Sequence, residues 1–144
     1  MAHFAKIENS EVAQVIVADQ SHVDSIGGEW VKVSYNMYGG VYHDPSTNEP
    51  ADDQTVIVGD EARERKNYPA PGWLYDGVGF YPKQPYPSWR FNHSTYLWDA
   101  PIAPPSDNRS FDDEGNFIQY TWSEEIYNLD ASKGWVRLEI ANAD

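Results

Sequence analysis

The first forty residues alternate between apolar and polar side chains in three short runs. Residues 2–8 alternate loosely, residues 12–18 are apolar enough for a buried strand, and residues 30–35 alternate again. A period of two is typical of β-strands, because successive side chains point to opposite faces of a sheet. Asn9-Ser10 between the first two runs predicts a tight turn, so these strands form a hairpin.

A short helix is predicted between the second and third strands. Ser21 or Asp19 can cap a helix over about residues 21–26. The Gly27-Gly28 pair would end it, because glycine takes the left-handed backbone conformation at little cost.

The chain then becomes acidic. Residues 44–61 hold six acids and no Lys or Arg. We expect an exposed loop over residues 43–54, a short strand over residues 55–58 and one or two helical turns over residues 60–67.

Proline and aromatic residues dominate the remainder. Eight of the ten prolines lie between Pro69 and Pro105, and residues 81–87 alternate Pro with Tyr. Such a stretch favours extended, polyproline-like backbone, which is stiff and cannot pair as a central strand.

An approximate aromatic repeat runs through the same region. Residues 73–76, 96–99 and 120–123 share an aromatic residue, a spacer, a second aromatic residue and a small polar or acidic residue. Strand alternation would place the paired rings on one side, so a row of such strands would have one aromatic face. The alternative is that these spacings arise by chance in an aromatic-rich chain. Turn sequences follow at residues 92–94, 113–116 and 130–134.

These patterns predict a mainly β protein of the small α+β type. An N-terminal module of β-hairpin, short helix and strand covers residues 1–42, an acidic loop and connector covers residues 43–68, and a proline- and aromatic-rich β region covers residues 69–144. The composition agrees, with 15% aromatic residues and only four Leu in 144 residues. A chain of this length can bury roughly two-thirds of its unfolded surface.

Charge and composition restrict the partners. The net charge of −13 argues against nucleic acid, because phosphate binding needs a basic face, and the one basic cluster, Arg63, Arg65 and Lys66, has acids around it. No apolar run approaches the roughly 18 residues of a membrane span, so no membrane partner is expected. The lack of Cys excludes disulfides, thiolate zinc sites and cysteine nucleophiles.

Sequence motifs for catalysis or metal binding are weak. The four His are not at a zinc-binding spacing, and residues 112–116 have some likeness to a calcium loop but lack its spaced acids and distal glutamate. A hairpin turn is the simpler interpretation of these five residues. There is no nucleophile elbow, phosphate-binding loop or dinucleotide turn, so we expect no enzyme, no metal and no cofactor.

Six segments in order resemble one family. They are MAHFAKIE at residues 1–8, VIVA at 15–18, GEWVKVSYN at 28–36, RKNY at 65–68, PYPSW at 85–89 and LWDAP at 97–101. The order resembles small virion-associated structural proteins of tailed phages that infect cyanobacteria and other marine bacteria. The resemblance covers residues 1 to about 105 and is looser beyond. The acidic loop at 44–61 and the segment at 69–72 depart from the family pattern.

The resemblance implies a non-enzymatic virion component that assembles in the host cytoplasm in many copies, with capsid or other virion proteins as partners. The function we expect is that of an accessory or decoration protein on the phage head. Aromatic and proline-rich surfaces would bind shell subunits, because stiff segments lose little entropy on docking. The candidate partner-binding residues are Tyr81, Tyr86, Trp89 and Arg90.

Two alternatives stay open. The chain could be a tail, neck or fibre component that binds host surface glycan through exposed aromatic residues, with Trp89 and Trp98 as candidates. It could also be a small hydrolase on the particle, because 23 acids supply many carboxylate pairs. The sequence leaves open head or tail location, copy number, partner identity and the order of the 43–54 loop.

Overall fold

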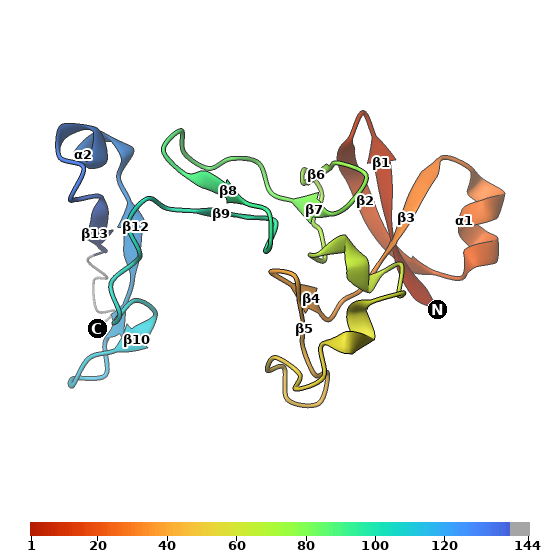
Figure 1. The fold of residues 1–144 in the computed structure, drawn as a ribbon, viewed down its shortest axis with the longest axis horizontal. Coiled ribbons are helices and arrows are strands. Elements are labelled where there is room, and N and C mark those ends of the chain that lie inside the picture. The colour runs from red at the N-terminus through yellow and green to blue at the C-terminus, as the bar shows by residue number, and fades with distance from the viewer. Residues whose placement is uncertain (139–144) are drawn as a thin grey trace, which may run out of the picture. The chain divides into compact units, whose positions relative to one another are not determined.

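The computed structural model describes residues 1–138 and shows a mainly β fold with two short α-helices, as the sequence predicts (Figure 1). The chain divides into two compact units. Unit 1 comprises residues 1–84 and 91–98, and unit 2 comprises residues 85–90 and the chain from residue 99 onward. These boundaries differ from the three sequence regions, because the chain crosses between the units within the proline- and aromatic-rich region.

Unit 1 contains a five-stranded antiparallel sheet. Its strands, in spatial order, are β3 (Glu29–Val33), β1 (Ala2–Glu8), β2 (Glu11–Ala18), β6 (Leu74–Tyr75) and β7 (Phe80–Tyr81). The predicted hairpin is confirmed, and its two turn residues, Asn9 and Ser10, have φ angles of 54° and 63°. Positive φ at both positions matches the right-handed twist of the flanking strands.

Alternation along β1 gives the sheet two buried faces. Ala5 and Ile7 join Val12, Val33 and Phe80 in the larger core. On the opposite face Phe4 packs with Ala18 of β2 and with Val23 of the helix. The sheet therefore has an apolar core on each side of β1. The buried strand expected over residues 12–18 is only partly buried, because Val12 and Ala18 are buried while Val17 is 54% exposed.

Helix α1 (Gln20–Ile26) confirms the predicted helix and its end at Gly27, whose φ is 71°. Asp19 occupies the N-cap position, but its side chain makes no capping hydrogen bond, and Ser21 lies inside the helix. The Asp19 carboxylate instead lies 3.8 Å from the N-terminal ammonium.

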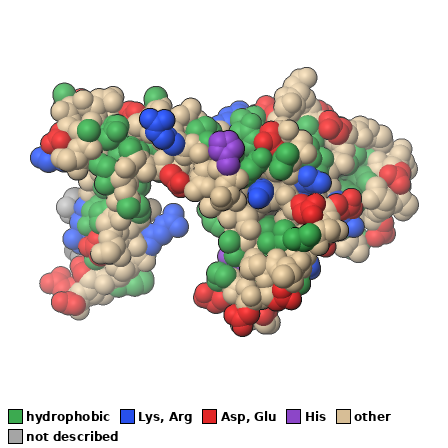
Figure 2. All heavy atoms as spheres, viewed as in Figure 1, with side chains coloured by type: hydrophobic (Ala, Val, Ile, Leu, Met, Phe, Trp, Pro, Cys, Tyr) green, Lys and Arg blue, Asp and Glu red, His purple; other side chains and the backbone are tan. Residues whose placement is uncertain are grey.

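A second hairpin follows, formed by β4 (Met37–Tyr38) and β5 (Val41–Tyr42). The acidic segment after it is held by its own side chains. Gln54 accepts a hydrogen bond from the Tyr42 N–H at 2.9 Å and donates to the Tyr42 and Ala51 carbonyls. Figure 2 shows carboxylates gathered at the tip of this loop.

The predicted strand at residues 55–58 is wrong. These residues form a 3₁₀ turn, η1 (Thr55–Ile57), because the Asp53 carboxylate accepts hydrogen bonds from both the N–H and the hydroxyl of Thr55. Those bonds close a turn before a strand can extend.

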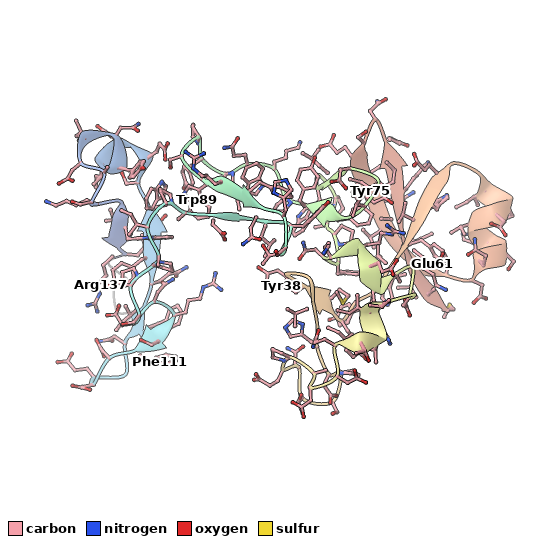
Figure 3. All side chains as sticks on the ribbon, in the orientation of Figure 1. Tyr38, Glu61, Tyr75, Trp89, Phe111 and Arg137 are labelled. Carbon is pink, nitrogen blue, oxygen red and sulfur yellow. The ribbon has the colours of Figure 1, made fainter. Side chains whose placement is uncertain are left out.

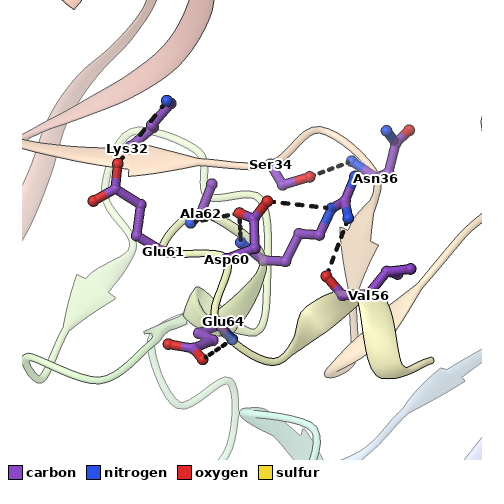
Figure 4. A network of polar contacts seen from close by, with 10 residues as sticks. Lys32, Ser34, Asn36, Val56, Asp60, Glu61, Ala62 and Glu64 are labelled. Atoms are coloured by element: carbon purple, nitrogen blue, oxygen red, sulfur yellow. Dashed lines mark hydrogen bonds and ion pairs between the residues drawn. The ribbon is translucent and has the colours of Figure 1, made fainter.

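The predicted helical turn within residues 60–67 is confirmed as η2 (Arg63–Arg65). Asp60 accepts hydrogen bonds from the N–H groups of Ala62 and Arg63 at 3.0 and 3.1 Å (Figure 4). The Arg63 guanidinium donates to the Val56 carbonyl at 3.1 Å and lies 4.4 Å from the Tyr42 ring. Arg63 therefore links η1, η2 and β5.

One buried amide connects the parts of unit 1. The Asn67 side chain is 1% exposed, accepts a hydrogen bond from the Gly39 N–H at 2.7 Å and donates to three carbonyls. The carbonyls are those of Phe80, Thr95 and Tyr96, at 3.0, 3.0 and 3.2 Å. Because the partners come from the β4–β5 turn, β7 and the turn around residue 95, Asn67 holds three distant segments together.

The backbone before Asn67 takes an unusual conformation. Lys66 has φ 75° and ψ −50°, and the Asn67 N–H donates to the Arg65 carbonyl at 2.9 Å. This is a strained γ-turn for a residue with a side chain. The turn points the Asn67 amide into the interior. Gly79 lies against it so closely that a Cβ would be 2.9 Å from the Arg65 carbonyl oxygen.

Strands β8 (Arg90–Asn92) and β9 (Leu97–Asp99) pair in a hairpin at the predicted turn. The Asn92 side chain accepts hydrogen bonds from the N–H groups of Ser94 and Thr95 at 2.9 and 3.1 Å. A short polar side chain thus closes this turn locally.

Unit 2, as far as residue 138, contains two two-stranded sheets and one helix. Its elements are β10 (Ser110–Phe111), β11 (Phe117–Ile118), β12 (Tyr120–Trp122), α2 (Glu124–Leu129) and β13 (Trp135–Arg137). The predicted turn at residues 113–116 joins β10 to β11. The predicted turn at 130–134 leads out of α2 instead of joining two strands.

The aromatic repeat does not make one sheet. Its three copies lie in β6, β9 and β12, which belong to three different sheets. The predicted row of strands with a single aromatic face is therefore wrong, because no copy pairs with another: β6 pairs with β2 and β7, β9 with β8, and β12 with β13. Within residues 1–138 no helix is long and apolar enough to cross a membrane.

Candidate functional site

Three tryptophans form the centre of unit 2. Trp122 and Trp135 are directly opposite each other on β12 and β13, with ring centroids 5.2 Å apart. The Trp89 ring lies 6.1 Å from each of them, in edge-to-face and tilted geometry. Gly134 is buried against the Trp122 ring, where any Cβ would collide with it. Trp122 is 5% exposed, so this cluster is the core of the unit.

One carboxylate ties residues 85–90 to this core. Glu124, at the start of α2, accepts hydrogen bonds from the N–H and hydroxyl of Ser88 at 3.0 and 2.6 Å. It also accepts one from the Trp122 indole N–H at 2.9 Å. The Ser88 and Trp122 donors lower the pKa of Glu124 below its ordinary value, because they favour the charged form.

Next to the cluster lies an open groove of about 420 Å³, which we call the C-terminal groove. It is lined by Ile102, Ala103 and Pro105, by Ile126 of α2 and by residues 132–135. The Trp135 indole N–H donates to the Ile102 carbonyl at 2.8 Å, which fixes the segment before β10 against β13. The walls are therefore formed without a ligand.

Other apolar side chains of unit 2 are exposed as well. Leu129, three residues after Ile126 on α2, is 83% exposed. Val136 and Leu138 are exposed near the C-terminal end of the described chain, and Phe111 and Phe117 form an exposed pair with centroids 5.4 Å apart. Ile126 lines the groove and Leu129 follows it by about one turn of α2, so these two side chains can extend the groove into an interaction surface.

The sequence candidates for partner binding fall in different places. Tyr81 belongs to unit 1, where its half-buried ring lies 5.2 Å from Phe91. Tyr86 and Trp89 belong to unit 2, are half-buried and pack on each other at 5.6 Å. Arg90 is exposed. Figure 3 labels Trp89 beside β8.

Sequence reasoning missed the groove. Ile126 and Leu129 are three apart on one face of α2, and this spacing was the available signal. This spacing is a weak signal, because a helix of six residues is too short to show a clear helical period in the sequence.

Trp98, a glycan candidate, is also half-buried. Its indole N–H donates to the Pro82 carbonyl at 2.7 Å, and its ring lies 5.3 Å from Phe91. The four most exposed aromatic rings of the described chain are instead Tyr35, Tyr38, Phe111 and Phe117.

Several carboxylates close local turns. Asp44, Asp53 and Asp130 each accept hydrogen bonds from the side-chain hydroxyl and the N–H of the residue two positions later, and these bonds lower their pKa values. Asp112, in the segment with some likeness to a calcium loop, accepts from the Asn116 and Glu114 N–H groups and closes the β10–β11 hairpin. Within residues 1–138 no three His, Asp or Glu side chains come together as metal ligands.

Comparison with protein-family models, with curated proteins and with solved structures finds no match to the chain.

Proposed function

We propose that the protein is a non-enzymatic structural component of a virus particle, and that it attaches by burying the C-terminal groove and Leu129 against another particle protein. The observation that carries the proposal is the contrast within unit 2. Its core is built around three tryptophans, while the mostly apolar groove stays open and Leu129 of α2 is exposed. Burial of such a surface on a partner supplies the attachment energy.

The partner we propose is an extended, basic and apolar segment of a shell protein. The chain carries a net charge of −13, so two copies repel one another while a basic partner is attracted. Glu125 places an exposed carboxylate on the first turn of the helix that carries Ile126, whereas the Asp130 carboxylate at the other end is 3.9 Å from the ammonium of Lys133, which also lines the groove. A basic residue of the partner beside an apolar one would match this pattern.

The resemblance to tailed-phage virion proteins supports a virion component without saying which one, and the position we propose is the phage head, as a decoration protein present in many copies. A tail, neck or fibre position is the competing form of the same proposal.

Binding to particles tests the proposal. Shells assembled from the major capsid protein encoded by the same genome are mixed with the purified full chain, and bound copies are counted after sedimentation. We expect saturable binding at a copy number that matches the symmetry of the shell. Binding to isolated tails alone would reject the head position, and binding to neither particle part would reject the proposed function.

A pair of matched variants locates the contact. Leu129 in unit 2 and Val58 in unit 1 are 83% and 82% exposed, so Leu129→Lys and Val58→Lys perturb folding equally little. We expect Leu129→Lys to weaken shell binding at least tenfold, because it removes an apolar contact and repels a basic partner, and Val58→Lys to leave it unchanged. Equal effects of the two variants would contradict the assignment of the surface to unit 2.

A further inference from the structure

The β4–β5 hairpin and the loop after it form a small polar pocket in unit 1. The pocket has a volume of about 240 Å³ and is lined by Tyr35, Asn36, Tyr38, His43 and Asn48. We call it the tyrosine pocket. Tyr35 is 71% exposed and Tyr38, labelled in Figure 3, is 60% exposed, so two of the most exposed rings of the described chain line one cavity.

The hairpin register places three of these side chains. Tyr38 pairs with Val41, and the His43 N–H donates to the Asn36 carbonyl at 2.9 Å, which extends the ladder by one position. Met37, between Asn36 and Tyr38, is buried. Alternation therefore directs Asn36, Tyr38 and His43 away from the core and into the pocket.

The walls are fixed before any ligand arrives. The Asp44 carboxylate accepts from the Ser46 N–H and hydroxyl at 2.8 and 2.7 Å, and the Asp44 carbonyl accepts from the Asn48 N–H at 2.7 Å. These bonds hold Asn48 at φ 59°. On the other side, Tyr35 stacks on His3 with centroids 5.8 Å apart. A preformed site loses little entropy on binding.

The pocket contains side-chain donors and acceptors that are available to hydrogen-bond a ligand. Within residues 1–138 the side-chain amides of Asn36 and Asn48 make no intramolecular hydrogen bond, so each presents a donor and an acceptor. His43 Nδ1 lies 3.1 Å from the Val41 carbonyl, which only accepts, so Nδ1 donates. In the neutral ring Nε2 is then an acceptor.

We infer that the tyrosine pocket binds a neutral sugar ring. The C–H face of a pyranose packs on an exposed tyrosine, and paired amides match neighbouring hydroxyls. Asp44 and Glu49 in the adjoining loop disfavour sialylated, sulfated or uronic sugars, and no Lys or Arg lines the cavity. The volume is below the roughly 300–1,000 Å³ of drug-sized sites, which suits one sugar ring. This inference does not depend on the proposed docking function of unit 2.

The test is NMR titration of the full chain with the methyl glycosides of glucose, galactose and mannose, with choline as a cationic comparison. A single sugar is expected to bind with a dissociation constant of about 1 mM, because a ligand of a dozen heavy atoms has limited affinity. We expect at least one glycoside to shift the amide signals of residues 35–48. No binding by any of the three, shifts elsewhere in the chain, or stronger binding of choline would overturn the inference.

Two variants and a control identify the contacts. Tyr38→Ala removes an exposed ring, and Asn48→Gly removes an amide while it keeps a residue that accepts positive φ. We expect each to weaken glycoside binding at least tenfold with the rest of the spectrum unchanged. Phe111→Ala removes a ring that is 68% exposed in unit 2, and binding should not change. Wild-type affinity in both pocket variants would contradict the assignment.

Discussion

In each of the two units one polar side chain joins segments that are distant in the sequence, but the chemical group differs between the units. In unit 1, distant segments meet on the buried neutral amide of Asn67, beneath a five-stranded sheet with apolar cores on both faces. In unit 2, the joining group is the Glu124 carboxylate, which holds Ser88 and Trp122. A neutral amide keeps its hydrogen bonds at any pH, whereas a carboxylate accepts hydrogen bonds most strongly when it is charged.

The cores differ as well. The described part of unit 2 has only two-stranded sheets, which are marginal on their own, so its core depends on the tryptophan cluster. Unit 1 has many interdependent contacts. We therefore expect unit 2 to be the less stable of the two units, because its core has fewer strands and fewer buried side chains.

The largest expected effect comes from the core of unit 2. Trp122→Ala removes the buried ring at the centre of the cluster, at a cost of about 3–5 kcal/mol. Because unit 2 has little else in its core, we expect it to unfold while unit 1 stays folded. Two-dimensional NMR of the amides would show unit 1 signals in place and unit 2 signals collapsed. Loss of both sets of signals would mean that the units share one cooperative core.

The second effect concerns Asn67. Asn67→Asp keeps the shape but replaces two N–H donors with an oxygen that faces three carbonyls. We expect a loss of about 3 kcal/mol in the free energy of unfolding, measured by urea denaturation. Asn128→Asp makes the same charge change at an exposed position on α2 and should cost little. Equal losses would show that charge, and not the buried hydrogen bonds, sets the cost.

The third effect is a dependence on pH. The lowered pKa of Glu124 means that its contribution to stability is present above about pH 4, the ordinary range of a carboxyl group, and is lost as the pH falls through the folded-state pKa. Thermal unfolding of unit 2, followed by the amide NMR signals of β12 and β13, should therefore shift to lower temperature on acidification. Glu124→Gln should reduce this acid dependence for unit 2. An unchanged acid limb in that variant would show that Glu124 is not the titrating group.

The smallest expected effect on stability comes from substitutions of two exposed apolar residues, one in each unit. Leu129→Ser and Val58→Ser should each change the free energy of unfolding by no more than about 0.5 kcal/mol, because both side chains are almost fully exposed. A larger loss for Leu129→Ser in chemical denaturation would mean that Leu129 serves folding and is no docking residue.

The N-terminal part of the fold was predictable from the sequence. Alternation in residues 2–8 and 12–18, the Asn9-Ser10 turn and the Gly27-Gly28 stop are local signals, and each marks a real element. The strand expected at 55–58 failed because a side-chain bond from Asp53 outweighed β propensity.

The long-range features were not predictable. Asn67 bonds to residues 13 to 29 positions away, and no periodicity in the sequence records such partners. The same holds for the candidate sites. Trp89 and Tyr38 are both aromatic residues, so residue type does not show which ring is in a core. The packing places Trp89 in a core and Tyr38 at a pocket.

Native-state hydrogen exchange of the full chain tests the central claim most directly. The division into a stable unit 1 and a less stable unit 2 predicts that the slowest amides lie in β1, β2, β3 and around Asn67. The amides of β12 and β13 should exchange through a separate opening of lower free energy. One common opening free energy for both groups of amides would contradict the division.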